Sequence, residues 1–331
     1  MKIKAILIPF FCLIQGVNAS ERNRVEYPCY RLSQEPGLTA DFDGAIWRAI
    51  PAKGGFLICE SNQLAAKKPT FFKAGWTGIN LCLAIKCYDG ESRRLRARAS
   101  EQGSVWLDDS VEIFFKPPKA KNYFQMVVNS AGTGYTGMGE AGSIGNPSWQ
   151  AKSVVNNDGW SINVIIPFKM LGQTPANGER WPANVARNSF TGVPAETHTC
   201  WPPLKTGFHD TANFGEFVFK TEAPSALEAG KIAADLNAAY VIFLKEQFGR
   251  WTKEYPASLL TIKECLQAPA LKSGAEALKA CWDEYARLST REGSTLDDQA
   301  IFLMRNTNLL RQTQEIKKQL ALEKLFANVG K

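Results

Sequence analysis

Residues 104–117, SVWLDDSVEIFFKP, bring a tryptophan and three carboxylates to the start of a strongly patterned strand. The two-residue period of a strand puts Val111 and Ile113 on one face and Glu112 on the other, with Trp106 just before the strand. An aromatic ring beside carboxylates suits a sugar, because the ring covers its C–H face while the carboxylates accept hydrogen bonds from its hydroxyls. The alternative is a core tryptophan followed by solvated turn aspartates.

Charged residues also have two catalytic interpretations. Asp108, Asp109 and Glu112 are the residue types of a glycoside hydrolase, which holds two carboxylates on either side of the scissile bond. His209 next to Asp210 has the composition of an acid–base pair. We expect no enzymatic activity, because the sequence predicts no barrel or other substrate cleft around either set.

The net charge of +7 is scattered along the chain, apart from the run RRLRAR at residues 93–98. Nucleic-acid binding is typical of a basic stripe or patch, so we expect no nucleic-acid partner. We interpret the arginine run as part of a solvated loop rather than as a dedicated anion site.

Residues 1–19 have the pattern of a secretory signal: Lys2 and Lys4, then the apolar run AILIPFFCLI, then small residues before Ser20. That run is too short to span a bilayer, and no later run approaches the roughly 20 apolar residues that a membrane helix needs. We therefore expect a secreted or periplasmic protein.

Seven cysteines remain once the signal, with Cys12, is removed. In an oxidising compartment most of them should pair, and an odd number predicts a free thiol or an intermolecular bond. We expect Cys265 and Cys281 to form a disulfide that closes a loop of about 15 residues. The sequence has no CxxC motif and only two histidines, so a structural zinc site is not expected.

Composition divides the mature chain into a β-rich part, residues 20–222, and a helical part, residues 223–331. Apolar residues alternate along residues 78–90, 123–129 and 159–168, and no helix-length amphipathic segment separates these strands. This pattern predicts a mainly β fold, an antiparallel β-sandwich.

In the helical part, two capping boxes mark helix starts, Ser225 with Glu228 and Thr295 with Asp298. Three or four helices are expected, because this part also contains the helix breakers Pro256, Pro269, Gly274 and Gly293. We expect a helical bundle or coiled coil. It would act as a spacer, as a self-association element or as a binding site for a protein partner.

Seven motifs follow one another between residues 36 and 221: LTADFDGAIWRAI, GINLCLAIKCYDG, WLDDSVEIFF, YFQMVVNSAGT, WQAKSVVNNDGWSINVIIPFKMLG, RWPANVARNSF and GFHDTANFGEFVF. Their types and order resemble the family 9 carbohydrate-binding modules and their DOMON-like relatives. The resemblance implies a two-sheet β-sandwich, often stabilised by calcium, that binds saccharides or polysaccharide ends without cleaving them. A place in a carbohydrate catabolic system would fit this activity.

The family's site residues map onto Trp106, Glu112, Gln125 and Phe208. The family often has a basic residue at Gln125 and a tryptophan at Phe208. Trp201 is either a second stacking platform or a core residue, and we favour the core. Asn184 and Asn188 lie two alternation steps apart, so they share one strand face and are candidates for amide hydrogen bonds to the ligand.

Two alternatives remain open. DOMON-type sandwiches hold haem between a methionine and a histidine, and this chain offers Met126, Met138 and Met170 with His198 and His209. The second alternative is a non-catalytic subunit of a glycoside hydrolase complex, attached through the helical part.

Overall fold

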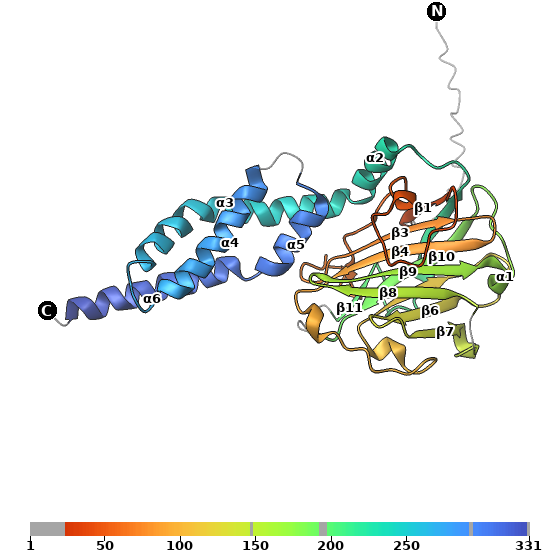
Figure 1. The fold of residues 1–331 in the computed structure, drawn as a ribbon, viewed down its shortest axis with the longest axis horizontal. Helices are drawn as coiled ribbons and strands as arrows, with labels where there is room; N and C mark the ends of the chain where they lie inside the picture. Colours follow the sequence, from red (N-terminus) through yellow and green to blue (C-terminus); the bar gives the residue numbers. More distant parts are fainter. Residues whose placement is uncertain (1–23, 146–147, 192–196, 291–293, 330–331) are drawn as a thin grey trace, which may run out of the picture.

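A computed structural model describes residues 24–145, 148–191, 197–290 and 294–329. The signal expected at residues 1–19 lies outside these residues and stays a prediction. The described chain forms a β-domain followed by helices that extend away from it (Figure 1). The fold is therefore mainly β with a C-terminal helical part, as the sequence predicts.

The β-domain is one mixed sheet that folds over on itself in two layers. Its strand order is β7-β6-β5-β10-β12-β1-β3-β4-β9-β8, and β11 pairs with β10 and β2. The strands are β1 Glu26–Arg31, β2 Leu57–Ile58, β3 Thr70–Trp76, β4 Asn80–Tyr88, β5 Ser110–Phe115, β6 Phe124–Asn129, β7 Gly134–Met138, β8 Gln150–Asn156, β9 Gly159–Pro167, β10 Arg180–Asn188, β11 His198–Cys200 and β12 Gly215–Lys220.

The sheet differs from the purely antiparallel prediction at one strand. β1 runs parallel to both of its neighbours, β12 and β3, while the other pairings between strands are antiparallel. β1 thus joins the layer that holds β5 and β10 to the layer that holds β4 and β9. The strand's own sequence, EYPCYR, gave no signal for this placement.

The main core lies between the two layers. Apolar side chains of alternating residues enter it from β4, β5 and β9, including Leu83, Ile113 and Val164, which are all fully buried. Burial of such side chains stabilises each by roughly 1.5–3 kcal/mol. Because alternate residues of β5 point inward, the residues between them, Glu112 and Phe114, lie on the outer face of this layer.

The helices are α1 Phe168–Leu171, in the β-domain, then α2 Ala226–Leu236, α3 Ala238–Cys265, α4 Lys272–Thr290, α5 Leu296–Asn306 and α6 Leu309–Val329. Both expected capping boxes are present, at Ser225 and Thr295. Helices α3 to α6 lie side by side as an elongated bundle (Figure 1). No helix among the described residues is long and apolar enough to cross a membrane.

Two of the expected helix breaks are wrong. Pro256 lies inside α3, and Gly274 lies inside α4. A proline in a helix removes one backbone hydrogen bond, which disfavours the helix. Here the buried side chains of Trp251 and Ile262 on either side pack into the bundle core, and this burial outweighs the lost bond. Gly293 lies outside the described residues.

The bundle is attached to the β-domain through its first turns and through α5, where Asp297 accepts a hydrogen bond from the Tyr88 hydroxyl at 2.7 Å. The side chain of Asn237 accepts a hydrogen bond from Gly54 N at 2.7 Å and donates one to Ala52 O at 2.9 Å. Tyr240 packs over Gly55, whose φ is +65°, and a Cβ there would meet Tyr240 Cβ at 2.7 Å. The domain boundary expected at residue 222 stays a prediction. Removing the chain after it would expose the surface of residues 52–55 that Asn237 and Tyr240 cover.

Candidate functional site

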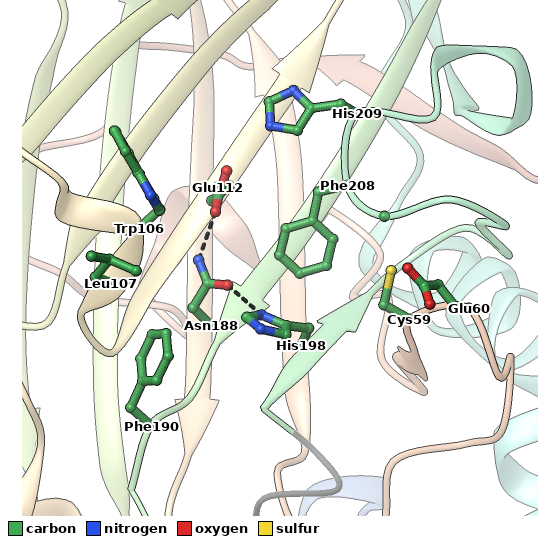
Figure 2. A pocket seen from close by; sticks show the side chains of 11 residues that line it. Cys59, Glu60, Trp106, Leu107, Glu112, Asn188, Phe190, His198, Phe208 and His209 are labelled. Atoms are coloured by element: carbon green, nitrogen blue, oxygen red, sulfur yellow. Dashed lines mark hydrogen bonds between the residues drawn. The ribbon is translucent and has the colours of Figure 1, made fainter.

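A pocket of about 420 Å³ opens on the outer face of the β5 and β10 layer. Its lining comes from six places in the sequence: the turn Val105–Leu107, β5, the end of β10, β11 and two loops. Figure 2 shows the lining side chains, which belong to Cys59, Glu60, Trp106, Leu107, Glu112, Asn188, Phe190, His198, Phe208 and His209. Gly207 also lines the pocket. Four of the sequence-predicted site residues are among them: Trp106, Glu112, Asn188 and Phe208.

Glu112 forms the base of the pocket and is 3 % exposed. Its carboxylate accepts hydrogen bonds from Asn188 Nδ2 at 2.6 Å and from Gln125 Nε2 at 2.7 Å. The strand pairing fixes this arrangement, because Glu112 lies opposite Ala186 of β10 and Val127 of β6. Gln125 and Asn188 are therefore its diagonal neighbours on the same face.

The carboxylate of Glu112 also sets the protonation of His198. A carboxylate only accepts, so the NH₂ group of Asn188 must face Glu112 and the Asn188 oxygen must face away. That oxygen lies 2.8 Å from His198 Nδ1, which must therefore carry the proton. In the neutral form favoured by partial burial, which lowers the pKa of His198, Nε2 is left as an acceptor. Figure 2 shows this series of hydrogen bonds.

Burial raises the pKa of Glu112, although the hydrogen bonds from Asn188 and Gln125 partly oppose the rise. The ionised form is thus disfavoured in the free protein relative to an exposed glutamate. A ligand hydroxyl that donates to this carboxylate would supply a further hydrogen bond to the charged form. The site holds an acceptor that gains from a ligand with hydroxyl groups.

Three aromatic side chains surround this polar base. Trp106 is 37 % exposed. Its ring and that of Tyr135 meet edge to face, with their centroids 5.0 Å apart. Figure 2 shows Trp106 and Phe208 on opposite sides of Glu112, with Phe190 near Leu107. Phe190 is also 37 % exposed, and His198 lies edge-on to both phenylalanines. The pocket therefore has apolar walls around a small set of hydrogen-bonding groups.

The other predicted site residues lie behind the pocket. Gln125 is buried and reaches it only through Glu112. Asn184 is buried and donates from Nδ2 to the carbonyl of Phe208 at 3.3 Å, so it supports the loop that carries that ring. Trp201 does not line the pocket: it is 3 % exposed in the main core and stacks on Phe217 at 5.7 Å. The core interpretation of Trp201 agrees with this position, and the platform interpretation does not.

The carboxylates of the catalytic interpretations hold loops in place. Asp108 accepts from the backbone N–H groups of Arg98 and Ala99, and Asp109 accepts from those of Arg96 and Phe190. Both aspartates are buried. Asp210 accepts from Lys205 N at 2.8 Å, while its neighbour His209 bonds the hydroxyl of Tyr123 at 2.6 Å. Of the four carboxylates in these two sets, Glu112 lines the pocket, and Asp108, Asp109 and Asp210 do not.

The side chains that could hold calcium or haem can be located among the described residues. Within the described ranges, no three His, Cys, Asp or Glu residues cluster so as to hold a metal ion, and the calcium expectation stays a prediction. Met126 is fully buried in the main core, and Met138 and Met170 pack against that core. His198 and His209 lie on the outer face, so the sheet separates the haem-ligand candidates.

Sequence reasoning missed Phe190, His198, Cys59, Glu60 and Leu107 as pocket residues. Cys59 and Glu60 follow β2, a two-residue strand whose pairing with β11 joins distant segments of the chain. Phe190 lies two residues after the end of β10, and its alternation with Asn188 was the one usable signal.

All seven described cysteines are free thiols, so the structure does not form the expected bond between Cys265 and Cys281. Cys59 and Cys200 instead lie close together. β2 and β11 pair Leu57 with Cys200, which puts Cys59 and Cys200 on one face as diagonal neighbours. The Cys200 thiol donates to Pro202 O at 3.2 Å, and its interaction with Cys59 lowers the pKa of Cys59, which favours the thiolate.

We expect Cys59 and Cys200 to form a disulfide under oxidising conditions. Closing a loop of about 140 residues should stabilise the fold by up to about 5 kcal/mol in the chain-entropy model. Peptide mass mapping of the unreduced protein should find the Cys59–Cys200 link, and a reductant should lower the melting temperature. Cys59→Ser should remove both effects. Alkylation of both thiols in the oxidised protein would contradict the bond.

A scan against protein-family models finds no match, and a search of curated proteins finds none either. Among solved structures, the chain is similar to a "putative carbohydrate-binding protein" from Bacteroides uniformis, with 17% identity and a TM-score of 0.47. That match covers 60% of this chain and 100% of the other.

The chain is also similar to a family 9 carbohydrate-binding module. This module, from Caldicellulosiruptor kristjanssonii, was solved in complex with cellotriose and with glucose, and both matches have 19% identity and a TM-score of 0.46. They cover 61% and 60% of this chain, and 96% and 98% of the module.

The buried Glu112 gives a pH prediction of its own. Because its folded pKa is raised, its contribution to stability is fully present below the unfolded pKa and is lost as pH rises through the folded pKa. Glu112→Gln removes this loss, and the amide of Gln125 can turn to restore the hydrogen bond. From about pH 4 to pH 7 the melting temperature of the variant should rise relative to the parent. Parallel melting curves across this range would contradict the prediction.

Proposed function

We propose that this chain is an exported, non-catalytic saccharide-binding protein that uses the pocket around Glu112 as its binding site. The observation that supports this most is the joint placement of Trp106, Phe190 and Phe208 around one buried carboxylate. Sugars present apolar C–H faces and hydroxyl edges, and this pocket offers matching apolar walls and a hydrogen-bonding base.

Binding proceeds by stacking and hydrogen bonding. A sugar ring lies between Trp106 and Phe208, where its C–H faces contact the aromatic rings. Its hydroxyls donate to the carboxylate of Glu112 and to Nε2 of His198. Each displaced water is replaced by a direct hydrogen bond, and Asn188 holds both acceptors in place. A pocket of about 420 Å³ is sized for one or two sugar units at a chain end.

The proposal is tested with a glycan array probed by the full-length mature protein, with and without a calcium chelator. Binding of a defined set of saccharides that is lost in Trp106→Ala supports it. The calcium expectation predicts weaker binding after chelation. Chromatography of the bound saccharides after a long incubation should recover them intact, and shortened products would overturn the non-catalytic part.

Export and a role in carbohydrate catabolism complete the proposal. The pattern of residues 1–19 supports export, and N-terminal sequencing of protein from the extracellular or periplasmic fraction should begin at Ser20. Recovery of the uncleaved chain from the cytoplasm would contradict it. The helical part, residues 223–331, would then attach the saccharide-binding domain to a protein partner or to a second copy.

A further inference from the structure

A second hollow adjoins the saccharide pocket on the same face of the β-domain. It has a volume of about 430 Å³ and is lined by Glu91, Arg94, Arg96, Arg98, Phe190 and Thr191. We name it the arginine hollow. Phe190 lines both cavities, so one aromatic ring forms the boundary between them. A ligand that extends past Phe190 from the pocket would meet the guanidinium groups.

The segment that carries the arginines of this hollow is fixed through its backbone. Arg96 N donates to Asp109 Oδ2 at 2.6 Å, and Arg98 N donates to Asp108 Oδ2 at 2.9 Å. Leu95, between Arg94 and Arg96, packs against the main core. The segment is thus anchored by two buried aspartates and one apolar side chain, while its arginines face outward.

Asp109 also holds the other wall of the hollow. It accepts from Phe190 N at 2.9 Å and from Thr191 Oγ1 at 2.8 Å. Asp108 and Asp109 belong to the stretch that carries Trp106 and Glu112, so one short segment positions both cavities. Such preorganisation lowers the entropy cost of binding a ligand group between the walls.

The charges within the hollow leave a positive excess. Arg94 pairs with Glu91 at 3.3 Å, where both side chains are exposed, and Arg96 Nε lies 3.7 Å from the buried Asp108. The Arg96 guanidinium also covers the Phe190 ring, with Cζ 5.3 Å from its centroid. Within the described part of the chain, the Arg98 guanidinium has no ion-pair partner. Guanidinium groups bind carboxylates and sulfates through paired N–H donors.

We propose that the arginine hollow binds an acidic group, a carboxylate or a sulfate ester, on the sugar unit next to the one in the pocket. The inference rests on the proposed function, since it assigns the protein an acidic saccharide as ligand. A nucleic acid fits less well, because the basic residues form no stripe beyond this hollow and the aromatic pocket adjoins it directly.

The test compares oligosaccharides that share a backbone and differ in charge. Isothermal titration of the full-length protein would use trigalacturonic acid and its methyl ester, and cellotriose with its C6-carboxylated and 6-sulfated forms. We expect the acidic member of the recognised backbone to bind about tenfold more tightly at low salt, as one charge-assisted hydrogen bond would give. The preference should shrink as salt is added. Comparison of the carboxylated and sulfated forms of cellotriose shows which acidic group is preferred.

Arg98→Gln and Arg93→Gln form a matched pair of variants. Both positions are exposed arginines of the same run, but Arg93 does not line the hollow. Arg98→Gln should reduce the preference for the acidic sugar about threefold or more and leave the neutral affinity unchanged. Arg93→Gln should leave both unchanged.

Several results would overturn the inference. If neutral and acidic members bind equally, the hollow has no role while the saccharide pocket stands. If Arg93→Gln reduces the preference as much as Arg98→Gln, the effect is general charge rather than a site. If a short single-stranded oligonucleotide competes as well as the acidic sugar, the surface binds polyanions without selection. If no saccharide binds, the proposed function itself fails.

Discussion

Replacing Trp106 by alanine should weaken saccharide binding about tenfold or more and leave the melting temperature nearly unchanged. An aromatic stack contributes roughly 0.5–1.5 kcal/mol beyond the apolar area that it covers, and the lost area adds to this. The ring is 37 % exposed, meets Tyr135 and lies outside the main core, so its removal opens no cavity in that core. Isothermal titration and calorimetric melting of the same samples measure both quantities.

Trp201→Ala is the matched control for this variant. Trp201 is 3 % exposed in the main core, and truncation of a buried tryptophan costs roughly 3–5 kcal/mol of stability. The two tryptophan variants should therefore separate, one losing affinity and the other stability. A folded Trp106→Ala protein that binds like the parent would move the stacking role to Phe190 and Phe208.

Replacing Asp89 by alanine should lower the free energy of unfolding by about 3–5 kcal/mol. Asp89 is fully buried and pairs with Lys68 at 2.6 Å and with Arg187 at 3.0 Å. The Arg187 side chain is also fully buried and donates to Tyr88 O at 2.8 Å, so this group joins β4 to β10. Removal of the carboxylate leaves two buried cations with no counter-charge between them, and this accounts for the expected cost.

The pH dependence of Asp89→Ala distinguishes this cause from simple loss of packing. Burial lowers the pKa of Lys68, and Asp89 opposes that effect. Without Asp89 the folded pKa of Lys68 falls further below its unfolded value, so the variant's stability should rise with pH relative to the parent above neutrality. Asp43→Ala, which removes an exposed carboxylate near Lys73 and Lys86, should cost less than about 1 kcal/mol. Urea denaturation at several pH values gives both comparisons.

Local patterns in the sequence predicted the parts of the structure that depend on local rules. Strand alternation correctly placed Glu112 away from the core face of β5, because register and burial fix which side chains point inward. The capping boxes at Ser225 and Thr295 likewise depend on residues three positions apart. The mainly β class followed from the same alternation.

The remaining features depend on contacts between distant segments. The pairing of β2 with β11 brings Cys59 to the pocket, and no local pattern encodes it. The helix through Pro256 continues because tertiary packing outweighs an unfavourable local preference. Phe190 lies at the boundary of two cavities only because Asp109, far away in sequence, binds its backbone.

A crystal structure of the mature protein with the tightest-binding saccharide from the array tests the central claim most directly. We expect a sugar ring between Trp106 and Phe208, with one hydroxyl within hydrogen-bond distance of the Glu112 carboxylate and the next unit beside Phe190. A saccharide bound at any other surface, with this pocket free of it, would contradict the account.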